Sequence, residues 1–576
     1  MRAPAAGRGW WLAAPALAVI LSVVLYPLVF ATYYSLREVR PNLVGDWSGL
    51  SNYSRMLHDP GFLGALSTTL AFTAASSTLS LVLGFSIALA LNRVTKGRGA
   101  LTAIFLIPWA FALVVVATIS RLLVNDQVGI VGYAVKALGI LDQPLLTDPP
   151  ALLVVAILAD VWRGTPLVVL LLLAGLSTIP AELHEAASVD GAGSLQRFFR
   201  ITVPLLRPTL PVVLLFRALD AFRVYDLFWV MSGRQLESIS TYIYENVMIS
   251  QFNFGLGMAG AVFVFECALS TAAVFIALFG AQASTGLQHS GLYERGRSGP
   301  GGRLLPYAVL APAALAFAAP PLWVLKMSLV SPRELLSTPP DILPNSLSIF
   351  PYLAILGNGA FLLSLANSTL IAGTVTLLTL LLGTPAAYAI SRLGLRHGNR
   401  MLAGMLAVSF FPPVAVLAPM LIQLGAFGLA NSYLAVILPN TAFLLPLAIW
   451  LLSTFFRELP ADVEEAARAC GATTFQVLRK VTVPLAAPSV LAAGALIFIL
   501  AWNEFIFANT FLFDPGLRPV TVLLAGFAGT VNPNYGLLAA SSLVATLPPV
   551  LLILAIQRRL VPGPTGGQGN KKSRGA

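Results

Sequence analysis

Charged side chains are scarce in this sequence: Asp, Glu, Lys and Arg make up 10% of 576 residues, while 57% are hydrophobic. A soluble protein of this length needs far more polar surface, so a soluble globular fold is excluded. Cysteine and histidine are also rare, with two and four residues. Cys267 lies in an apolar run, Cys470 lies in a polar segment between runs, and the histidines show no ligand spacing. Neither an extracytoplasmic disulfide nor a structural metal is expected.

Apolar runs long enough to cross a bilayer recur along the whole chain. A membrane-spanning helix needs about 20 apolar residues. The first run follows Arg2 and Arg8 and is too long for a signal-peptide core, so we interpret it as an uncleaved anchor. The sequence therefore predicts an all-α membrane protein with about twelve spans, at 11–36, 64–92, 100–122, 151–177, 209–230, 257–281, 305–329, 361–390, 400–423, 433–457, 489–513 and 536–557.

The net charge of +11 comes from Lys and Arg residues whose distribution along the chain indicates how it is oriented in the membrane. Lys and Arg concentrate in segments that share one side if both termini are cytoplasmic, such as 93–98, 392–400 and 457–480. The positive-inside rule then fixes the orientation, with both termini on the cytoplasmic side. No nucleic-acid partner is expected from the basic excess.

A polar segment rich in Gly and Ser, residues 281–303, separates six predicted spans from six. Because six is even, each half begins and ends on the cytoplasmic side, and the halves are parallel repeats. The predicted organisation is a first half at 1–280, a cytoplasmic linker at 281–303, a second half at 304–560 and a disordered basic tail at 561–576.

One polar segment occurs twice. Between 180–208 and 460–488, 13 of 29 positions are identical without a gap. Each copy predicts a short helix that begins after proline, a turn at Gly191 or Gly471, and a second short helix leading back to the membrane. An interfacial amphipathic hairpin would explain one copy. Duplication favours contact with a two-fold symmetric partner.

These residues carry a family resemblance. "EAASVDGAG" and "EAARACGAT" resemble the EAA signature of permeases of ATP-binding-cassette (ABC) importers, and the first copy resembles the carbohydrate-uptake branch that includes maltose and glycerol-3-phosphate permeases. The segments 216–234, 501–513 and 535–563 are similar to two different permeases of such pairs, so the resemblance covers both halves. It implies a type I ABC importer transmembrane fold, in the cytoplasmic (inner) membrane of a prokaryote, in which two permeases are fused into one chain. Cys470 departs from the pattern, since the first copy has Asp190.

The resemblance also implies partners and roles. The EAA helix of this family couples the permease to a nucleotide-binding subunit, which implies two ATPase subunits, as a homodimer, and an extracytoplasmic solute-binding protein. The chain itself is expected to bind no cofactor and no metal and to catalyse no reaction; Mg-ATP is used by the ATPase partners, because no phosphate-binding G-x-x-x-x-G-K-[ST] motif occurs. The implied coupling residues are Glu185, Ala186, Ala187 and Gly191 in the first copy, and Glu465, Ala466, Ala467 and Gly471 in the second.

Polar side chains inside predicted spans are candidates for the substrate pathway, because a charge in the bilayer is costly unless it is paired or faces a cavity. A continuous helix would align the charges of the fifth span in one row of alternating sign, and Asp160 would pair with Arg163 three residues away. Tyr225 and Trp229 add aromatic faces of the kind that stack on sugar rings. The candidates are Arg217, Asp220, Arg223, Tyr225 and Asp226 in the fifth span, and Trp502, Asn503 and Glu504 in the eleventh.

Three alternatives remain beside sugar import. Fused permeases with two EAA segments also serve ferric iron, thiamine or polyamine uptake. A twelve-span secondary transporter is a rival of a different class, although the loops "RVTKGRG" and "SRLGLRHGNR" lack the acidic and paired basic residues expected of it. An intramembrane enzyme is disfavoured because no segment assembles a nucleophile with a base or a metal set.

Overall fold

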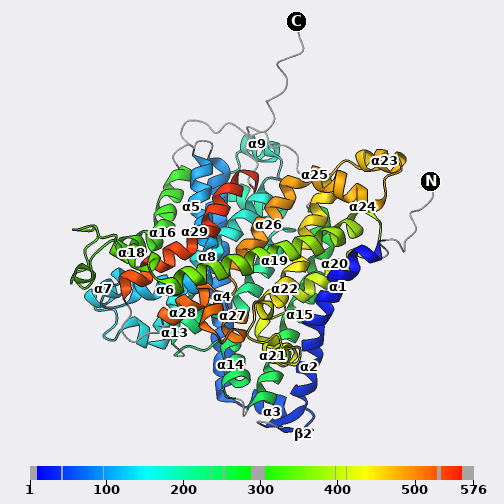
Figure 1. Cartoon of the computed structure of the whole chain (residues 1–576). Coiled ribbons are helices and arrows are strands. Elements are labelled where there is room, and N and C mark those ends of the chain that lie inside the picture. The colour runs from blue at the N-terminus through cyan, green and yellow to red at the C-terminus, as the bar shows by residue number, and fades with distance from the viewer. Residues whose placement is uncertain are drawn as a thin grey trace.

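The computed structural model describes residues 9–40, 43–94, 97–233, 235–250, 253–286, 305–395, 397–409, 411–528 and 534–560. These residues are mostly helical (Figure 1). A two-stranded antiparallel hairpin, β1 (Arg37–Arg40) with β2 (Leu43–Trp47), follows the first span. Helices dominate because a chain in lipid must satisfy its backbone hydrogen bonds internally.

The first half contains the helices α1 (Trp10–Ile20), α2 (Tyr26–Ser35), α3 (Ser51–Leu57), α4 (Pro60–Arg93), α5 (Arg98–Ala110), α6 (Leu113–Val124), α7 (Ile130–Ala137), α8 (Pro149–Leu176), α9 (Ala181–Val189), α10 (Ser194–Arg197), α11 (Val203–Leu205), α12 (Leu210–Phe222), α13 (Asp226–Ser232), α14 (Ile239–Tyr244) and α15 (Phe254–Gly286). Its π-helical turns are Leu21–Leu25, Phe198–Thr202 and Glu245–Ile249, and a 3₁₀ turn is Leu145–Thr147.

The second half contains α16 (Leu305–Ser328), α17 (Pro332–Leu335), α18 (Phe350–Leu356), α19 (Gly359–Arg392), α20 (Gly398–Ser409), α21 (Leu417–Ala426), α22 (Tyr433–Glu458), α23 (Ala461–Ala469), α24 (Thr474–Val477), α25 (Val483–Leu485), α26 (Ala487–Trp502), α27 (Ile506–Phe511), α28 (Val520–Ala528) and α29 (Tyr535–Leu560). Its 3₁₀ turns are Pro413–Val416 and Pro515–Leu517, and its π-helical turn is Leu478–Thr482. The predicted linker is described only to Gly286, where α15 ends; its remainder and the predicted tail lie outside the described residues.

Eight helices among the described residues are long and apolar enough to cross a membrane, and three bent pairs raise the number to eleven. The predicted third, fifth, ninth and eleventh spans are interrupted. α5 and α6 meet at 98° after Pro108, and α20 is followed by prolines before α21 begins. Proline removes a backbone donor and favours such breaks, which the length of an apolar run does not reveal.

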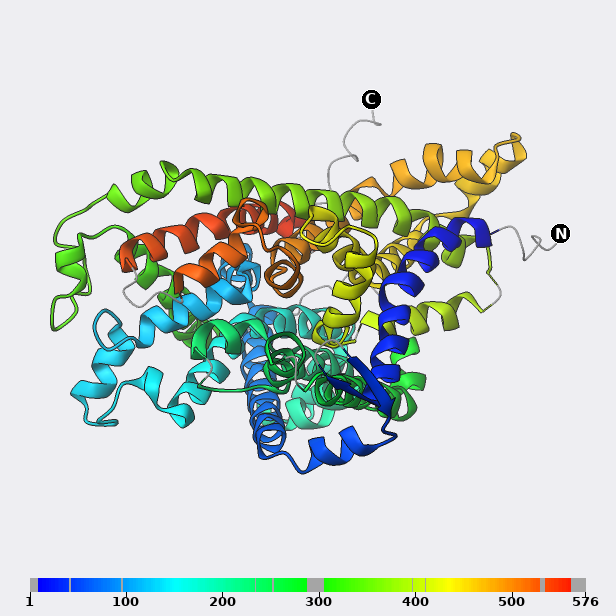
Figure 2. The same cartoon turned by 60° about the horizontal axis from the view of Figure 1, so that its bottom comes forward.

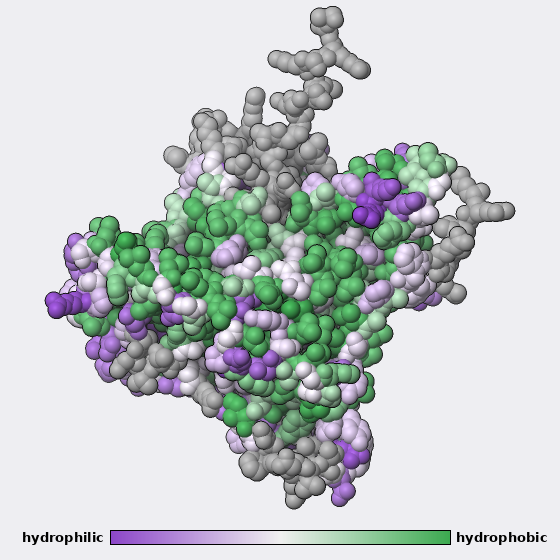
Figure 3. Space-filling model, in the orientation of Figure 1, coloured by the Kyte–Doolittle hydropathy of each residue, from purple (hydrophilic) through white to green (hydrophobic). Residues whose placement is uncertain are grey.

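Large apolar side chains point outward over the spans. Val82 of α4 and Leu377 of α19 are exposed, as expected of surfaces that meet lipid. Figure 3 shows apolar residues across the middle of one face and polar residues gathered at upper right, over α23 and its neighbours. The surface therefore agrees with a membrane protein whose polar parts project at its ends.

The two halves repeat individual hydrogen bonds. The Ser35 and Tyr53 hydroxyls are 2.8 Å apart, and those of Ser328 and Tyr352 are 2.7 Å apart. In the same way, Ile239 donates its backbone N–H to Thr69 (2.8 Å) and Val520 donates to Ser368 (2.9 Å). α4 and α19 each have 34 residues. The internal repeat therefore extends well beyond the two segments, 180–208 and 460–488, in which sequence identity is evident.

The first helix of each half packs against helices of the other half. α1 packs on α19 and α22, with Ala13 and Ala16 buried in the same cluster as Ala386 and Ala387. In return α16 packs on α4, α5 and α6, and the Trp162 indole of α8 donates to the Phe317 carbonyl of α16 (3.0 Å). Figure 2 shows α1 beside the second-half helices and α19 running across the molecule. Small residues let these helices approach closely.

The close contact of α1 with the second half gives a stability prediction. Ala16→Leu should lower the free energy of unfolding by about 1–3 kcal/mol, because Ala16 is fully buried and the added atoms overpack the contact. Thermal unfolding of the detergent-solubilised protein measures the effect. Leu21→Phe is the control, since Leu21 is about half exposed in the next turn. An Ala16→Leu protein as stable as wild type would contradict this packing.

Candidate functional site

The duplicated segment folds into the same helix, turn and helix in both halves. α9 and α23 each have nine residues and end at Gly191 (φ +80°) and Gly471 (φ +84°). Ala192 donates its N–H to the Ala187 carbonyl (2.9 Å), and Ala472 donates to that of Ala467 (3.1 Å). This six-to-one bond with left-handed glycine is the Schellman ending of a helix. The turn predicted at the two glycines is therefore present.

Both short helices are exposed along one face. No side chain of α9 is buried, and Glu185, Ala186, Glu465 and Ala466 are all exposed. Apolar side chains are exposed at equivalent places, Leu183 with Val463 and Leu195 with Phe475. Figure 1 shows α9 and α23 at one end of the molecule, opposite β2 and α3. Matched surfaces with exposed apolar side chains are typical of sites that bind another protein.

The predicted fifth and eleventh spans break at equivalent positions. α12 ends at Phe222 and α13 begins at Asp226; α26 ends at Trp502 and α27 begins at Ile506. The carbonyls freed at the breaks are satisfied in the same way, since the Ser238 hydroxyl donates to Val224 (2.8 Å) and the Thr521 hydroxyl to Glu504 (2.9 Å). Such unwound backbone inside a membrane protein is tolerated where it is buried in protein or lines a cavity.

Arg217 is the centre of a buried ion pair. Its guanidinium contacts the Asp160 carboxylate, donates to the hydroxyls of Ser76 (2.6 Å) and Ser80 (3.2 Å), and lies 3.5 Å from Asp220. The Arg217 side chain is 3% exposed. These contacts join α4, α8 and α12, so Arg217 holds helices together.

Two pairings expected from sequence are different in the structure. Asp160 contacts Arg217, whereas Arg163 lies 3.9 Å from Asp220 and donates to the Phe111 carbonyl (3.2 Å) at the bend after α5. The row of alternating charges also stops at Asp220, because α12 ends before Arg223 and Asp226 begins a new helix. Residues three positions apart lie on the same face only where the helix is continuous.

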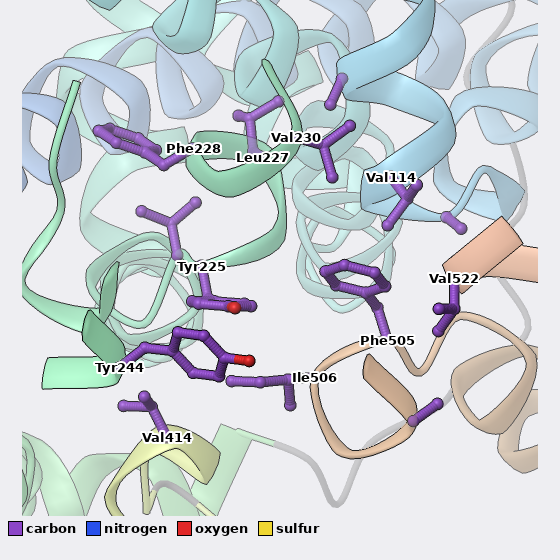
Figure 4. Close-up of a cluster of buried hydrophobic side chains, with 14 of the residues drawn as sticks. Val114, Tyr225, Leu227, Phe228, Val230, Tyr244, Val414, Phe505, Ile506 and Val522 are labelled. Carbon is purple, nitrogen blue, oxygen red and sulfur yellow. The ribbon is translucent and has the colours of Figure 1, made fainter. Parts of the chain in front are cut away.

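Aromatic residues from both halves meet beside the two breaks (Figure 4). The Tyr225 ring stacks on that of Trp229, with centroids 5.6 Å apart, and lies 5.1 Å from Tyr244 and 6.2 Å from Phe505. The Asn509 amide donates to the Tyr244 hydroxyl (3.4 Å). We call these five residues the aromatic cluster. It joins α13 and α14 of the first half to α27 of the second.

The three candidates of the eleventh span take separate positions. Trp502 is buried and its indole donates to the Ala545 carbonyl of α29 (3.1 Å), so it packs away from the cluster. Glu504 accepts the N–H groups of Phe507 (2.6 Å) and Ala508 (3.2 Å), which caps α27. Asn503 Oδ1 is buried without a hydrogen-bond partner.

Sequence reasoning missed part of the cluster. Phe505 could have been found, because the offset of 280 that aligns the two copies places it opposite Tyr225. Tyr244 and Asn509 carry no comparable signal, since α14 and α27 are brought together only by the fold. Among the described residues, no group of three His, Cys, Asp or Glu could hold a metal ion.

The chain belongs to the family of binding-protein-dependent transport system inner membrane components, whose model matches residues 80–284 and 380–565. It is 38% identical over 279 residues to the trehalose transport system permease protein SugA of Mycobacterium tuberculosis, covering 48% of this chain and 89% of SugA. It is 36% identical to the trehalose/maltose transport system permease protein MalF of Thermococcus litoralis, covering 46% of this chain and 92% of MalF. A chain of a bacterial alginate ABC transporter, solved with an alginate pentasaccharide-bound periplasmic protein, is 23% identical with a TM-score of 0.41, covering 50% of this chain and 97% of that chain.

These findings confirm the predicted family. One family domain occurs in each half, and a whole relative corresponds to about half of this chain, as expected of two permeases fused in one polypeptide. The chain is thus a multi-span inner-membrane transport component.

The packing of Arg217 gives a prediction about Gly164 of α8. A Cβ added at Gly164 would lie 2.7 Å from Arg217 Nε, and the guanidinium could move away only by weakening its contacts with Asp160, Ser76 and Ser80. Gly164→Ala should therefore destabilise the protein by about 1–3 kcal/mol, although alanine normally stabilises a helix by up to about 1 kcal/mol. Gly373→Ala in α19 is the matched control, because open space surrounds Gly373. Unfolding midpoints that rise for both variants would contradict the prediction.

Proposed function

We propose that this chain is the membrane permease of a binding-protein-dependent ABC importer that moves a sugar into the cytoplasm, with energy from separate ATPase subunits. The observation that carries the proposal is the pair of matched helices α9 and α23, each ended by a left-handed glycine. The cargo class is supported by the relatives, which are described as trehalose and trehalose/maltose permeases. The chain itself catalyses no reaction and holds no cofactor.

The coupling helices dock into two equivalent grooves of an ATPase homodimer. Ala186 and Ala466 leave the exposed faces flat, and Leu183 and Val463 supply apolar contact on the same helices. Glu185 and Glu465 are exposed and free to meet basic groups of the ATPase. Mg-ATP binding closes the ATPase dimer, and α9 and α23 carry that motion to the spans.

The transport pathway passes between the halves at the aromatic cluster. Tyr225 and Trp229 offer ring faces for a sugar, and Asn509 and Tyr244 offer hydrogen-bonding groups. Asp226 and Glu504 add carboxylates beside the two breaks. Arg217 has a positioning role instead, because its charge is already paired and buried. Irregular backbone at the interface between repeats is the usual place of a transporter site.

Orientation follows from the coupling helices. The end of the molecule that carries α9 and α23 faces the cytoplasm, and the opposite end with β2 and α3 faces outward (Figure 1). The distribution of Lys and Arg in the sequence favours a cytoplasmic position for both termini. An extracytoplasmic binding protein delivers cargo to that outer end. The two halves then rock between inward-open and outward-open states.

The turn glycines give a test of coupling. Gly191→Pro combined with Gly471→Pro should lower ATP-dependent uptake at least about ten-fold, because proline fixes φ near −65° where these turns require about +80°. Membrane insertion should remain, since both turns lie outside the spans. Uptake into cells or vesicles is measured together with the amount of protein in the membrane.

A control lies in the same loop. Gly193 has φ −66° and open space around it, and the second copy carries Thr473 at that position. Gly193→Thr should therefore leave uptake unchanged. Uptake by the double proline variant at the wild-type rate would exclude α9 and α23 as coupling helices.

The cargo is tested by mild-detergent purification of the tagged chain from native membranes, followed by thermal unfolding of the copurified binding protein with candidate ligands. We expect sugars to raise its unfolding midpoint, because binding to the folded state alone stabilises it. Stabilisation by ferric iron, thiamine or polyamines would retain the importer and replace the cargo. Recovery of neither an ATPase nor a binding protein would favour a secondary transporter.

A further inference from the structure

Glu464 of α23 is a buried charge within an otherwise exposed helix. Its side chain is 5% exposed, whereas the neighbouring Glu465 is exposed. A carboxylate out of contact with water requires compensation by positive charge or hydrogen bonds. Glu464 precedes the EAA residues by one position, so it faces the membrane domain while they face outward.

Four side chains satisfy the Glu464 carboxylate. Oε1 accepts a hydrogen bond from the Thr482 hydroxyl (3.0 Å) and lies 3.5 Å from Arg392 Nε. Oε2 accepts from the Tyr388 hydroxyl (3.3 Å) and lies 3.3 Å from Arg468 Nη2. Arg468 also donates to the Tyr388 hydroxyl (3.0 Å), and Arg392 donates to the Leu459 carbonyl. We call Glu464 and these four residues the Glu464 cluster.

The cluster joins the coupling segment to a long span. Tyr388 and Arg392 lie in the last two turns of α19, while Arg468 belongs to α23 and Thr482 follows α24. α19 packs in turn on α22 and α26, and α26 ends at the break that carries Glu504. A contiguous set of packed elements therefore leads from α23 to the proposed pathway.

Among the described residues, the first half keeps Arg93 and Thr202 opposite Arg392 and Thr482 but lacks the carboxylate that they would compensate. The offset of 280 places His184 opposite Glu464 and Ser188 opposite Arg468, and the equal lengths of α4 and α19 place Leu89 opposite Tyr388. Burial lowers the pKa of the His184 imidazole, and the charges of Arg197 and Arg93 lower it further, so this position offers no negative charge to the neighbouring arginines. Arg197 contacts the backbone carbonyl of His184 (3.4 Å).

We propose that Glu464 is a positioning residue that fixes the second coupling helix to α19, so that the two coupling helices are mechanically unequal and α23 transmits the larger share of the ATP-driven motion. This inference rests on the proposed function of α9 and α23. A charged cluster with four partners resists sliding between α23 and α19, because any displacement leaves a buried charge without compensation. α9 has no carboxylate at the equivalent position and can shift against α4 at lower cost.

The test compares matched variants of the full chain in its native complex. Glu464→Gln keeps the shape and removes the charge, and His184→Gln changes the equivalent position of the first half. We expect Glu464→Gln to lower the uptake per ATP hydrolysed about ten-fold, with the ATPase still copurifying, and His184→Gln to change it less than about two-fold. Glu464→Asp, which retains the charge, should recover a large part of the coupling.

Cys470 supplies a second, local measurement. It is exposed at the end of α23, and the other cysteine, Cys267, is removed as Cys267→Ala. A nitroxide label on Cys470 should become more mobile in Glu464→Gln. A label at Asp190→Cys, in a chain with Cys470→Ser, should keep its mobility in His184→Gln.

The outcomes separate the two proposals. Equal loss of coupling in Glu464→Gln and His184→Gln, or unchanged label mobility in Glu464→Gln, would overturn the role of Glu464. A wild-type complex without ATP-dependent uptake would overturn the proposed function instead, while label mobility would still report whether Glu464 fixes α23.

Discussion

The need to compensate every charge that is removed from water controls much of this structure. In the first half Arg217 meets Asp160 between α8 and α12. The repeat places Ile497 and Asn440 at those positions in the second half, so both charges are absent together. Replacing an ion pair as a unit is often neutral, whereas removing one partner is costly. The two halves could therefore diverge here only by changing both positions.

The second half has its own ion cluster at a different level, where Glu464 meets Arg392 beside the coupling helix. In the first half the ion pair thus connects spans to one another within the membrane region. In the second half the ion cluster connects α23 to the span α19. The two halves have the same order of helices, but their buried ion pairs differ. Only the second half has a buried carboxylate at the helix that is proposed to receive motion from the ATPase. The similar φ values at Gly191 (+80°) and Gly471 (+84°) show that the two copies keep the same turn, although the contacts that hold α9 and α23 differ.

The sequence predicts the repeat, the turn glycines and the exposed EAA residues, because identical residues at a constant offset and a required positive φ are local signals. It does not predict the breaks after Phe222 and Trp502: polar residues interrupt both apolar runs there, but such residues fit a continuous helix as well as a broken one. It also favours Asp160 with Arg163 at helical spacing, whereas the observed partner Arg217 is 57 residues away and requires the packing of α12 on α8. The sequence does not predict the burial of Glu464 for a similar reason: its charge is compensated by Arg392, which lies in a different helix 72 residues earlier in the chain.

The exchange of first spans gives a physical reason for joining two permeases in one chain. α1 covers a face of α19 that is lined with alanine, and α16 covers α4, so each half leaves apolar surface uncovered without the other. Separate subunits must meet before these surfaces are covered, whereas a covalent link makes the contact intramolecular and raises its effective concentration. The exchanged helices also limit how far the halves can separate, since any opening must preserve the contacts of α1 with α19 and of α16 with α4. In the proposed transport cycle, rocking about these contacts would change the access to the aromatic cluster from either side and would leave the halves joined.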